Sequence, residues 1–395
     1  MPNKALADPP YPFAGWAERQ IAAFRDKTGA PALRNLRGAG LLVERAAVNG
    51  FVVPGAVSAG GGCRMLPAKD GWVAINLSRD DDRALLPALF LDGELDPACD
   101  TAIAAALLHW DAEAIVARGR ELGLAIAAVD DHPCSPPVHL MSVGTPRDPL
   151  SRLPLVIDLS ALWAGPLAGH LLWLAGAQVV KVESSRRPDA MRDGDPALFA
   201  LLNQGKANVS LDLKTSADRD ALIALIARAD MVIEAARPRA LRQLGIDADA
   251  LVASVPGLVW VTITGHGVTG EAADWVGFGD DCGVAGGLSR ALQNATGTPG
   301  FVGDAIADPL TGSTAANAAW DRWASGVGGR IVLSMSGVVQ AALQEERSRD
   351  AAGFDALLRQ WSAAVGQPIA SGPVRGTIAP VAMRGADNGA WVTPC

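Results

Sequence analysis

The sequence predicts an α/β protein in which a doubly wound, Rossmann-like parallel sheet is accompanied by a smaller α+β domain. Two observations support this fold class. From residue 155 onward, short apolar segments alternate with amphipathic helical segments, which indicates a parallel sheet covered by helices on both faces. The chain has 395 residues, of which 49% are hydrophobic and 19% charged, so we expect a well-buried globular protein with more than one core.

The first part of the chain is predicted to form helices, a small domain and a linker. Apolar residues at three- and four-residue steps indicate that residues 1–50 form a helical segment that packs on the large domain. Within residues 51–130, a glycine-rich loop precedes a turn at Lys69-Asp70-Gly71, a strand over 72–77 and short helices opened by aspartates. Residues 131–154 are rich in proline and polar residues, which is typical of a linker.

The large sheet is predicted within residues 155–346. We expect its strands at 155–160, 177–183, 207–213, 230–236, 258–264 and 328–335. The helices between and after them are clearest at 167–176, 216–229 and 336–346. Residues 347–395 are expected to add a C-terminal helix and an extended tail.

Composition and charge exclude several classes of protein. A net charge of −8 without a basic stripe argues against a nucleic-acid partner. No apolar run approaches the roughly 18 residues of a membrane span, and the N-terminus lacks the order of a secretory signal, so we expect a cytoplasmic protein without a membrane partner. The cysteines lack a CxxC pair, which indicates reduced thiols: Cys63, Cys99, Cys134, Cys282 and Cys395. The histidines also lack metal-ligand spacing, so no metal site is expected.

A dinucleotide site is disfavoured, although the predicted sheet invites a ligand at the carboxyl ends of its strands. The turn after the first strand, "DLSALWAGPLAG", contains no GxGxxG fingerprint. Glu183 ends the second strand, where an acid could bind a ribose, but a solvated strand end is the simpler interpretation. By itself, Gly165-Pro166 indicates only a tight turn into a helix.

Four stretches of the large domain resemble the family III CoA-transferases, which include formyl-CoA transferase, carnitine-type CoA-transferases and alpha-methylacyl-CoA racemases. The stretches are "VIDLSALWAGPLAGHLLWLAGAQVVKVE", "NQGKANVSLDLKTSADRDALIALIARADMVIEAARP", "LVWVTITGHGVTG" and "GDAIADPLTG". They follow the family's order and spacing over most of residues 153–345. In the family the sheet domain precedes the glycine-rich loop and small domain, whereas here it follows them, so the resemblance implies a permuted domain order. Exposed linkers and chain ends tolerate such a rearrangement.

The resemblance changes the interpretation of Asp308, which precedes Pro309 at the start of a predicted helix. From the residues alone this aspartate indicates a helix cap. The family's nucleophile is the aspartate of a "(V/A)AD-x-x-TG" segment, which residues 307–312 match. The resemblance therefore implies a transferase whose Asp308, kept ionised by the helix dipole and backbone N–H groups, attacks an acyl-CoA and then carries CoA as an aspartyl-CoA thioester.

Further site residues follow from the same resemblance. Gly60, Gly61 and Gly62 would form a mobile loop that stabilises oxyanions, with a flexible turn as the alternative. The residues implied to bind CoA are Leu162, Trp163, Ala164, Lys206, Arg237 and Leu244. Three positions depart from the family pattern and weaken the expected adenine side of the site: Ser184, Ala235 and Ala236.

The expected substrates are an acyl-CoA and a small carboxylic acid, with CoA passing through as a substrate and no permanently bound cofactor. The family also implies an interlocked, ring-like homodimer, and the permuted order leaves open whether this chain forms it. One alternative is an acyl-CoA racemase, but Phe278 and Gly279 stand where racemases have a His before an Asp, so one of two required bases is missing. Asp280 and Asp281 then serve as helix caps or acid–base groups. The other alternative is a catalytically silent CoA-binding subunit.

Overall fold

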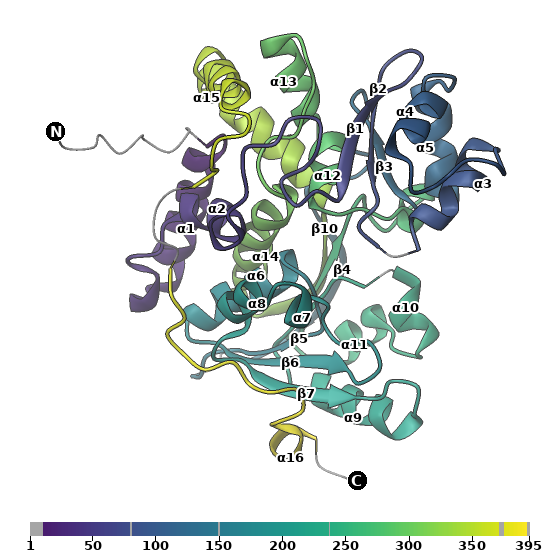
Figure 1. Ribbon diagram of the computed structural model, residues 1–395. Coiled ribbons are helices and arrows are strands. Elements are labelled where there is room, and N and C mark those ends of the chain that lie inside the picture. The colour runs from purple at the N-terminus through teal and green to yellow at the C-terminus, as the bar shows by residue number, and fades with distance from the viewer. Residues whose placement is uncertain (1–10, 80, 149–150, 237, 371–374, 393–395) are drawn as a thin grey trace.

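The computed structural model describes residues 11–79, 81–148, 151–236, 238–370 and 375–392 (Figure 1). Its strands are β1 (Cys63–Pro67), β2 (Trp72–Asn76), β3 (Ala125–Ala128), β4 (Val138–Pro146), β5 (Leu155–Asp158), β6 (Gln178–Ser184), β7 (Ala207–Leu211), β8 (Met231–Glu234), β9 (Val259–Thr264) and β10 (Val327–Ser334). Its helices are α1 (Ala14–Thr28), α2 (Gly38–Asn49), α3 (Leu86–Phe90), α4 (Asp100–Leu107), α5 (Ala112–Glu121), α6 (Ala164–Leu174), α7 (Met191–Gly194), α8 (Pro196–Asn203), α9 (Ser216–Ile226), α10 (Pro238–Gln243), α11 (Ala248–Ser254), α12 (Gly279–Ala285), α13 (Leu288–Thr296), α14 (Ala307–Ala324), α15 (Met335–Ala363) and α16 (Asn388–Trp391). Three short 3₁₀ helices complete the set: η1 (Pro31–Leu33), η2 (Arg83–Leu85) and η3 (Glu271–Asp274).

The large sheet confirms the predicted fold class. Its strands follow the order β4-β10-β9-β8-β5-β6-β7, and every neighbouring pair is parallel except β4 with β10. The chain winds outward from β5 to β6 and β7, then returns to β8 on the other side of β5. The direction of winding therefore reverses between β5 and β8, which is where open α/β sheets bind their ligands.

Both faces of this sheet are covered by apolar packing. In β9, Val259 and Val261 face a core shared with α6, α8 and α14, whereas Trp260 faces a second core shared with α9 and α11. Because neighbouring residues of a strand point to opposite faces, strands buried on both sides have continuous apolar sequences. This explains why the sequence pattern located them well.

The small domain forms a separate lobe at the upper right of Figure 1. Its antiparallel sheet has the order β1-β2-β3. Leu86, Leu89 and Ile115 belong to the core between one face and the helices α3, α4 and α5. The other face packs on α12 through Met65 and Val284, among others. β3 was not among the expected strands, because its short Ala-Ile-Ala-Ala sequence follows a helix without strand-like alternation.

The segment 131–154 differs from the expected linker, because it contains β4. This strand pairs with β10 along the edge of the large sheet and is mostly exposed. The prolines that surround it obscured the strand pattern, and an edge strand has one row of backbone groups that needs no partner strand.

Segments from the two ends of the chain pack on the large domain. Helices α1 and α2 share the core of α6 and α14. Residues 375–392 run past β7, where Asn388 accepts a hydrogen bond from the backbone N–H of Ser210 and donates one to its carbonyl oxygen. Arg375 donates to both carboxylate oxygens of the buried Glu44 on α2, at 2.7 and 3.1 Å. Among the described helices, none has the length and apolarity needed to cross a membrane.

Helix α14 crosses α6 at close range because Gly312 has no side chain. A Cβ at this position would lie 2.7 Å from the carbonyl oxygen of Ala164 and 3.0 Å from the Cβ of Leu167. The glycine therefore sets the distance between the two helices, and with it the position of Asp308 one turn earlier in α14.

We predict that Gly312→Ala lowers the free energy of unfolding by about 1–3 kcal/mol, because the added methyl group overpacks the α6–α14 crossing. The matched control is Gly40→Ala in α2, where the nearest atom to the new Cβ lies 3.8 Å away; this change should stabilise the protein by about 0.5–1 kcal/mol. Urea denaturation of both variants measures the difference. Equal effects of the two substitutions would contradict the close crossing.

Candidate active site

A cavity of about 1260 Å³ lies between the small domain and the carboxyl ends of the central strands of the large sheet. The turns after β5, β8 and β9 form part of its wall, with Leu162, Ala164, Ala235, Ala236, Thr264 and Gly265. The small domain supplies Arg79 and residues of α5, including Val116, Ala117 and Arg120. Asp308 also lines this cavity. The cavity thus occupies the point of reversal between β5 and β8 and requires both domains.

The carboxylate of Asp308 lies where three helices begin. Asp308 is the second residue of α14. The N–H of Ala164, the first residue of α6, donates to its Oδ1 across 3.3 Å. A Cβ on Gly279, the first residue of α12, would lie 2.2 Å from its Oδ2. Glycine is therefore needed at position 279 to leave room for the carboxylate, and the partial positive ends of the three helices favour its ionised form.

A strained turn directly before α14 positions Asp308 at these helix N-termini. The non-glycine residue Ala305 has φ 42°, in the left-handed region. Its N–H donates to Oδ1 of Asp280 across 3.0 Å, and its carbonyl oxygen accepts from the N–H of Asp308 at 2.9 Å. Such backbone strain persists only where surrounding contacts hold it, and it concentrates at functional sites.

Burial dominates the electrostatics of Asp308. Loss of hydration raises its pKa to about 7, although Arg45 and the N–H of Ala164 act in the opposite direction. Loss of hydration therefore opposes the helix N-terminus, which was expected to keep this group ionised. Burial likewise raises the pKa of Asp304 to about 7 and that of Asp280 above its usual value.

Arg45 on α2 is the counter-charge of this acidic group. Its Nη1 lies 3.3 Å from Oδ1 of the fully buried Asp304. Its guanidinium lies 5.8 Å from the ring centre of Trp163, the residue before α6. Arg45 lowers the pKa of Asp280, Asp304 and Asp308, so one cation opposes the burial cost of three carboxylates.

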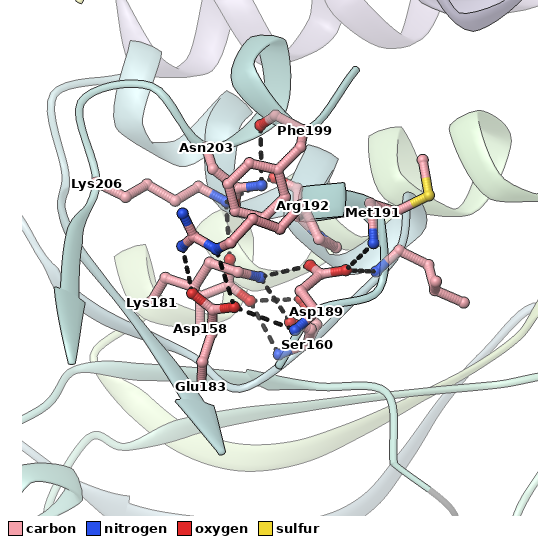
Figure 2. A network of polar contacts seen from close by, with 12 residues as sticks. Asp158, Ser160, Lys181, Glu183, Asp189, Met191, Arg192, Phe199, Asn203 and Lys206 are labelled. Atoms are coloured by element: carbon pink, nitrogen blue, oxygen red, sulfur yellow. Dashed lines mark hydrogen bonds and ion pairs between the residues drawn. The ribbon is translucent and has the colours of Figure 1, made fainter. Parts of the chain in front are cut away.

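A buried polar network fixes the turn between β5 and α6 (Figure 2). Leu162 in this turn has φ 68°, and its N–H donates to Oδ1 of Asp189 across 3.1 Å. Lys181 lies 2.9 Å from the other oxygen of Asp189 and donates to the carbonyl oxygen of Ser160 at 2.9 Å. Because Leu162 is strained and Ala164 follows two residues later, this network orients the N–H that reaches Asp308.

Only some of the expected CoA-binding residues lie at the cavity. Leu162 and Ala164 line the cavity with Asp308. Trp163 is 3% exposed and belongs to the core, and Leu244 packs against the core on the α9 side of the sheet. Arg237 lies outside the described residues.

Lys206 has a different environment from the expected phosphate site. It is buried, and its Nζ donates to Asp158 (2.8 Å), to the carbonyl oxygen of Pro166 (2.9 Å) and to Asn203 (3.1 Å). An ammonium group has three donors, and all three are used. This placement gives Lys206 a role in packing α6 against α8 and does not support a contact with CoA phosphates.

The glycine-rich loop also lies away from the cavity wall. Gly60 and Gly61 are exposed, and the N–H of Gly61 donates to the carbonyl oxygen of Ser58 at 2.8 Å. A Cβ on Gly60 would lie 2.6 Å from Nη2 of Arg45, and one on Gly62 would lie 2.1 Å from Oγ of Ser78. In this conformation the loop packs beside Arg45, and Gly60, Gly61 and Gly62 are not among the described residues of the cavity wall.

One cluster has residue types that could hold a metal ion. Side-chain ligand atoms of His266, Asp281 and Cys282 lie within 4.8 Å of one another and are buried. Asp281, however, accepts from the backbone N–H of Phe278 at 3.0 Å and from Asn76 on β2 at 3.2 Å. These bonds cap α12 and join it to the small domain, so we assign Asp281 a structural role.

Several residues of the site were not predicted from the sequence. Asp189 and Asp304 lie in loops, where an isolated aspartate indicates a turn or a cap. Arg45 and Arg120 lie on amphipathic helices, where a cation normally marks the solvated face. Their roles depend on contacts between distant segments, for which a single sequence contains no signal.

Comparison with known proteins adds independent information about this chain. The family model described as CoA-transferase family III matches residues 154–365. Succinyl-CoA–D-citramalate CoA-transferase from Chloroflexus aurantiacus is 33% identical over 183 residues, which cover 45% of this chain and 45% of that protein. Succinate–glutarate CoA-transferase from Agrobacterium fabrum is 33% identical over 179 residues, 42% of this chain and 44% of that protein. A solved structure of a hypothetical protein from Mycobacterium tuberculosis has 28% identity and a TM-score of 0.46, covering 53% of this chain and 60% of that chain. The matched part spans less than half the length of either curated relative.

We predict that Asp304→Asn becomes increasingly stabilising as the pH rises. The folded-state pKa of Asp304, about 7, exceeds the unfolded value of about 3.9, so the wild-type protein loses stability as the pH rises through this interval. Asparagine does not ionise, so the variant avoids that loss. Relative to wild type, its free energy of unfolding should rise by about 1–2 kcal/mol between pH 5.5 and pH 8. Urea denaturation at both pH values measures this, and a difference that stays constant or falls would contradict the assignment.

Proposed function

Because this chain belongs to the family III CoA-transferases, we propose that it transfers CoA from an acyl-CoA thioester to a carboxylic acid through a covalent intermediate on Asp308. The observation that supports this proposal most is a single carboxylate at the meeting point of three helix N-termini, facing a cavity at the reversal of the sheet. The two curated relatives are named as CoA-transferases of carboxylic acids.

The proposed reaction has four balanced steps. The Asp308 carboxylate attacks the thioester carbonyl, so that a mixed anhydride forms and CoA leaves as a thiolate. The thiolate attacks the Asp308 carbonyl of the anhydride, which releases the first acid and leaves an aspartyl-CoA thioester. The carboxylate of the second acid attacks this thioester and expels the CoA thiolate again. The thiolate finally attacks the acyl carbonyl of the second anhydride, which gives the new acyl-CoA and restores the Asp308 carboxylate.

The surroundings of Asp308 suit these steps. Its raised pKa, about 7, makes the ionised form more basic than an exposed aspartate and therefore a better nucleophile. The N–H of Ala164 already contacts the carboxylate at 3.3 Å and can stabilise negative charge that develops on the same oxygen.

Neither alternative from the sequence gains a specific observation. A racemase needs a second base beside Asp308. Gly279 contributes no side chain, and His266 is 2% exposed with its Nδ1 3.3 Å from Oγ of Ser336. A silent CoA-binding subunit would not need the carboxylate in this environment. The homodimer, the permuted domain order and a cytoplasmic location stay predictions from the family resemblance and the sequence.

We predict that Asp308→Asn lowers kcat for CoA transfer by more than about 10³-fold, because the covalent intermediate cannot form. Hydroxylamine added during turnover should convert Asp308 of the wild-type protein into a hydroxamate, which peptide mass spectrometry detects. Asp321→Asn, an exposed position near the other end of α14, is the control and should retain full activity. Label on another residue, or an active Asp308→Asn variant, would reject the proposal.

We also predict that Arg45→Met shifts the pH profile of transfer. The value of kcat/KM for wild type should rise with pH through about 7, as Asp308 becomes ionised. Removal of the counter-charge should raise this midpoint by about 1 or more, whereas Arg45→Lys should keep it near the wild-type value. A lower rate at every pH with an unchanged midpoint would indicate that Arg45 has only a structural role.

A further inference from the structure

Arg120 is a cation in the wall of the cavity that the proposed chemistry does not use. It lies in α5 of the small domain, and its guanidinium carbon is 3.9 Å from the ring centre of Trp275, which also lines the cavity. Stacking on an aromatic face holds a guanidinium in one plane while its edge remains available for hydrogen bonds.

The hydrogen-bonding capacity of Arg120 is only partly used. Its Nη2 donates to Oδ2 of Asp131 at 2.6 Å, and the same oxygen accepts from the N–H of Ala128 at 3.0 Å. Among the described residues, its Nη1 makes no hydrogen bond and is not among the buried unpaired atoms, whereas its unpaired Nε is buried and out of reach of a ligand. Five N–H donors in a fixed fork can serve a second carboxylate in addition to Asp131, so this side chain has donors for a ligand.

Among the other described charged groups of the wall, Arg79 also lies over an aromatic ring, that of Phe278, at 5.9 Å, but its side chain is 32% exposed. Arg79 donates from Nε to Asp82 at 2.8 Å and from Nη2 to the carbonyl oxygen of Gly123 at 2.8 Å. The remaining acidic residues of the wall are exposed and therefore screened by water: Glu113, Glu121, Glu271 and Asp274. The Arg120 side chain is only 11% exposed, so its charge acts with little screening on a bound molecule.

Apolar side chains also line the cavity. Val116, Val276, Phe278 and Met335 contribute to its wall. Such side chains suit a hydrocarbon spacer. Asp308, these apolar side chains and Arg120 all line this one cavity, which suits a substrate with a carboxylate at each end and methylene groups between them.

We propose, on the basis of the CoA-transferase function proposed above, that Arg120 binds the remote carboxylate of a dicarboxylic acid whose other carboxylate reacts at Asp308. Arg120 is then a specificity-determining residue. It takes no part in bond making, and a monocarboxylic acid of the same length leaves its donors unpaired.

The test measures kcat/KM for free acids with one acyl-CoA donor and the purified full chain. Glutarate is compared with valerate, and adipate with hexanoate, so that each pair has equal chain length. Wild type should prefer the dicarboxylic acid of each pair. Arg120→Gln should lower kcat/KM for the dicarboxylic acids by about 10- to 100-fold, mainly through KM, and leave the monocarboxylic acids within about twofold. Arg120→Lys should restore part of the preference.

The control is Arg118→Gln, since Arg118 in the same helix donates to the carbonyl oxygens of Ala88 and Leu89 and is not among the described residues of the cavity wall. This variant should keep the wild-type preference. Equal use of both classes by wild type, or equal losses for both classes in Arg120→Gln, would overturn the proposal. A different result would reject the transferase function itself: no acid of either class accepts CoA, and hydroxylamine does not label Asp308.

Discussion

The energetic conflict at one partly buried carboxylate governs the rest of the structure. Asp308 loses its hydration in the cavity wall, which favours the protonated form, whereas three helix N-termini, the N–H of Ala164 and the charge of Arg45 favour the ionised form. The loss of hydration outweighs the opposing contributions, so the pKa of Asp308 rises to about 7. A carboxylate of this kind can act as a nucleophile and later as a leaving group, because both forms are accessible at similar free energy.

Much of the surrounding architecture serves to keep this balance. The three helices can converge only because Gly279 and Gly312 leave space for the carboxylate and for the α6–α14 crossing. Two residues with left-handed backbone, Leu162 and Ala305, lie in the turns that lead to α6 and α14. The N–H of Leu162 is bound by the buried Asp189, and the N–H of Ala305 by the partly buried Asp280. The strained backbone at these two residues costs local stability but places α6 and α14 correctly, and the hydrogen bonds to the two aspartates offset the cost.

The sequence predicted the large sheet better than it predicted the site. The central strands of that sheet are buried on both faces, so their apolar runs are unambiguous in the sequence. The family motif at Ala307–Gly312 identified Asp308, which lines the cavity. β4 and β3 were missed because an edge strand between prolines and an alanine-rich strand lack alternation. Lys206 and Trp163 were assigned to CoA from motif position alone, and both proved to be buried in packing. Asp304, the ion-pair partner of Arg45, and Trp275, on which Arg120 stacks, lie far from these arginines in the sequence, so no local pattern indicates the contacts.

The ion pair between Arg375 and Glu44 connects the C-terminal segment to α2, which carries Arg45, the counter-charge of Asp308. Glu44 precedes Arg45 in α2, and both of its oxygens are bound by the tail arginine in a buried position. Without that arginine, Glu44 would remain desolvated and unpaired, and α2 would have to shift to rehydrate it. Proteolytic removal of Arg375 would therefore displace Arg45, the residue after Glu44 on α2, from the acidic group. The pKa of Asp308 would then change, while the large sheet stayed folded.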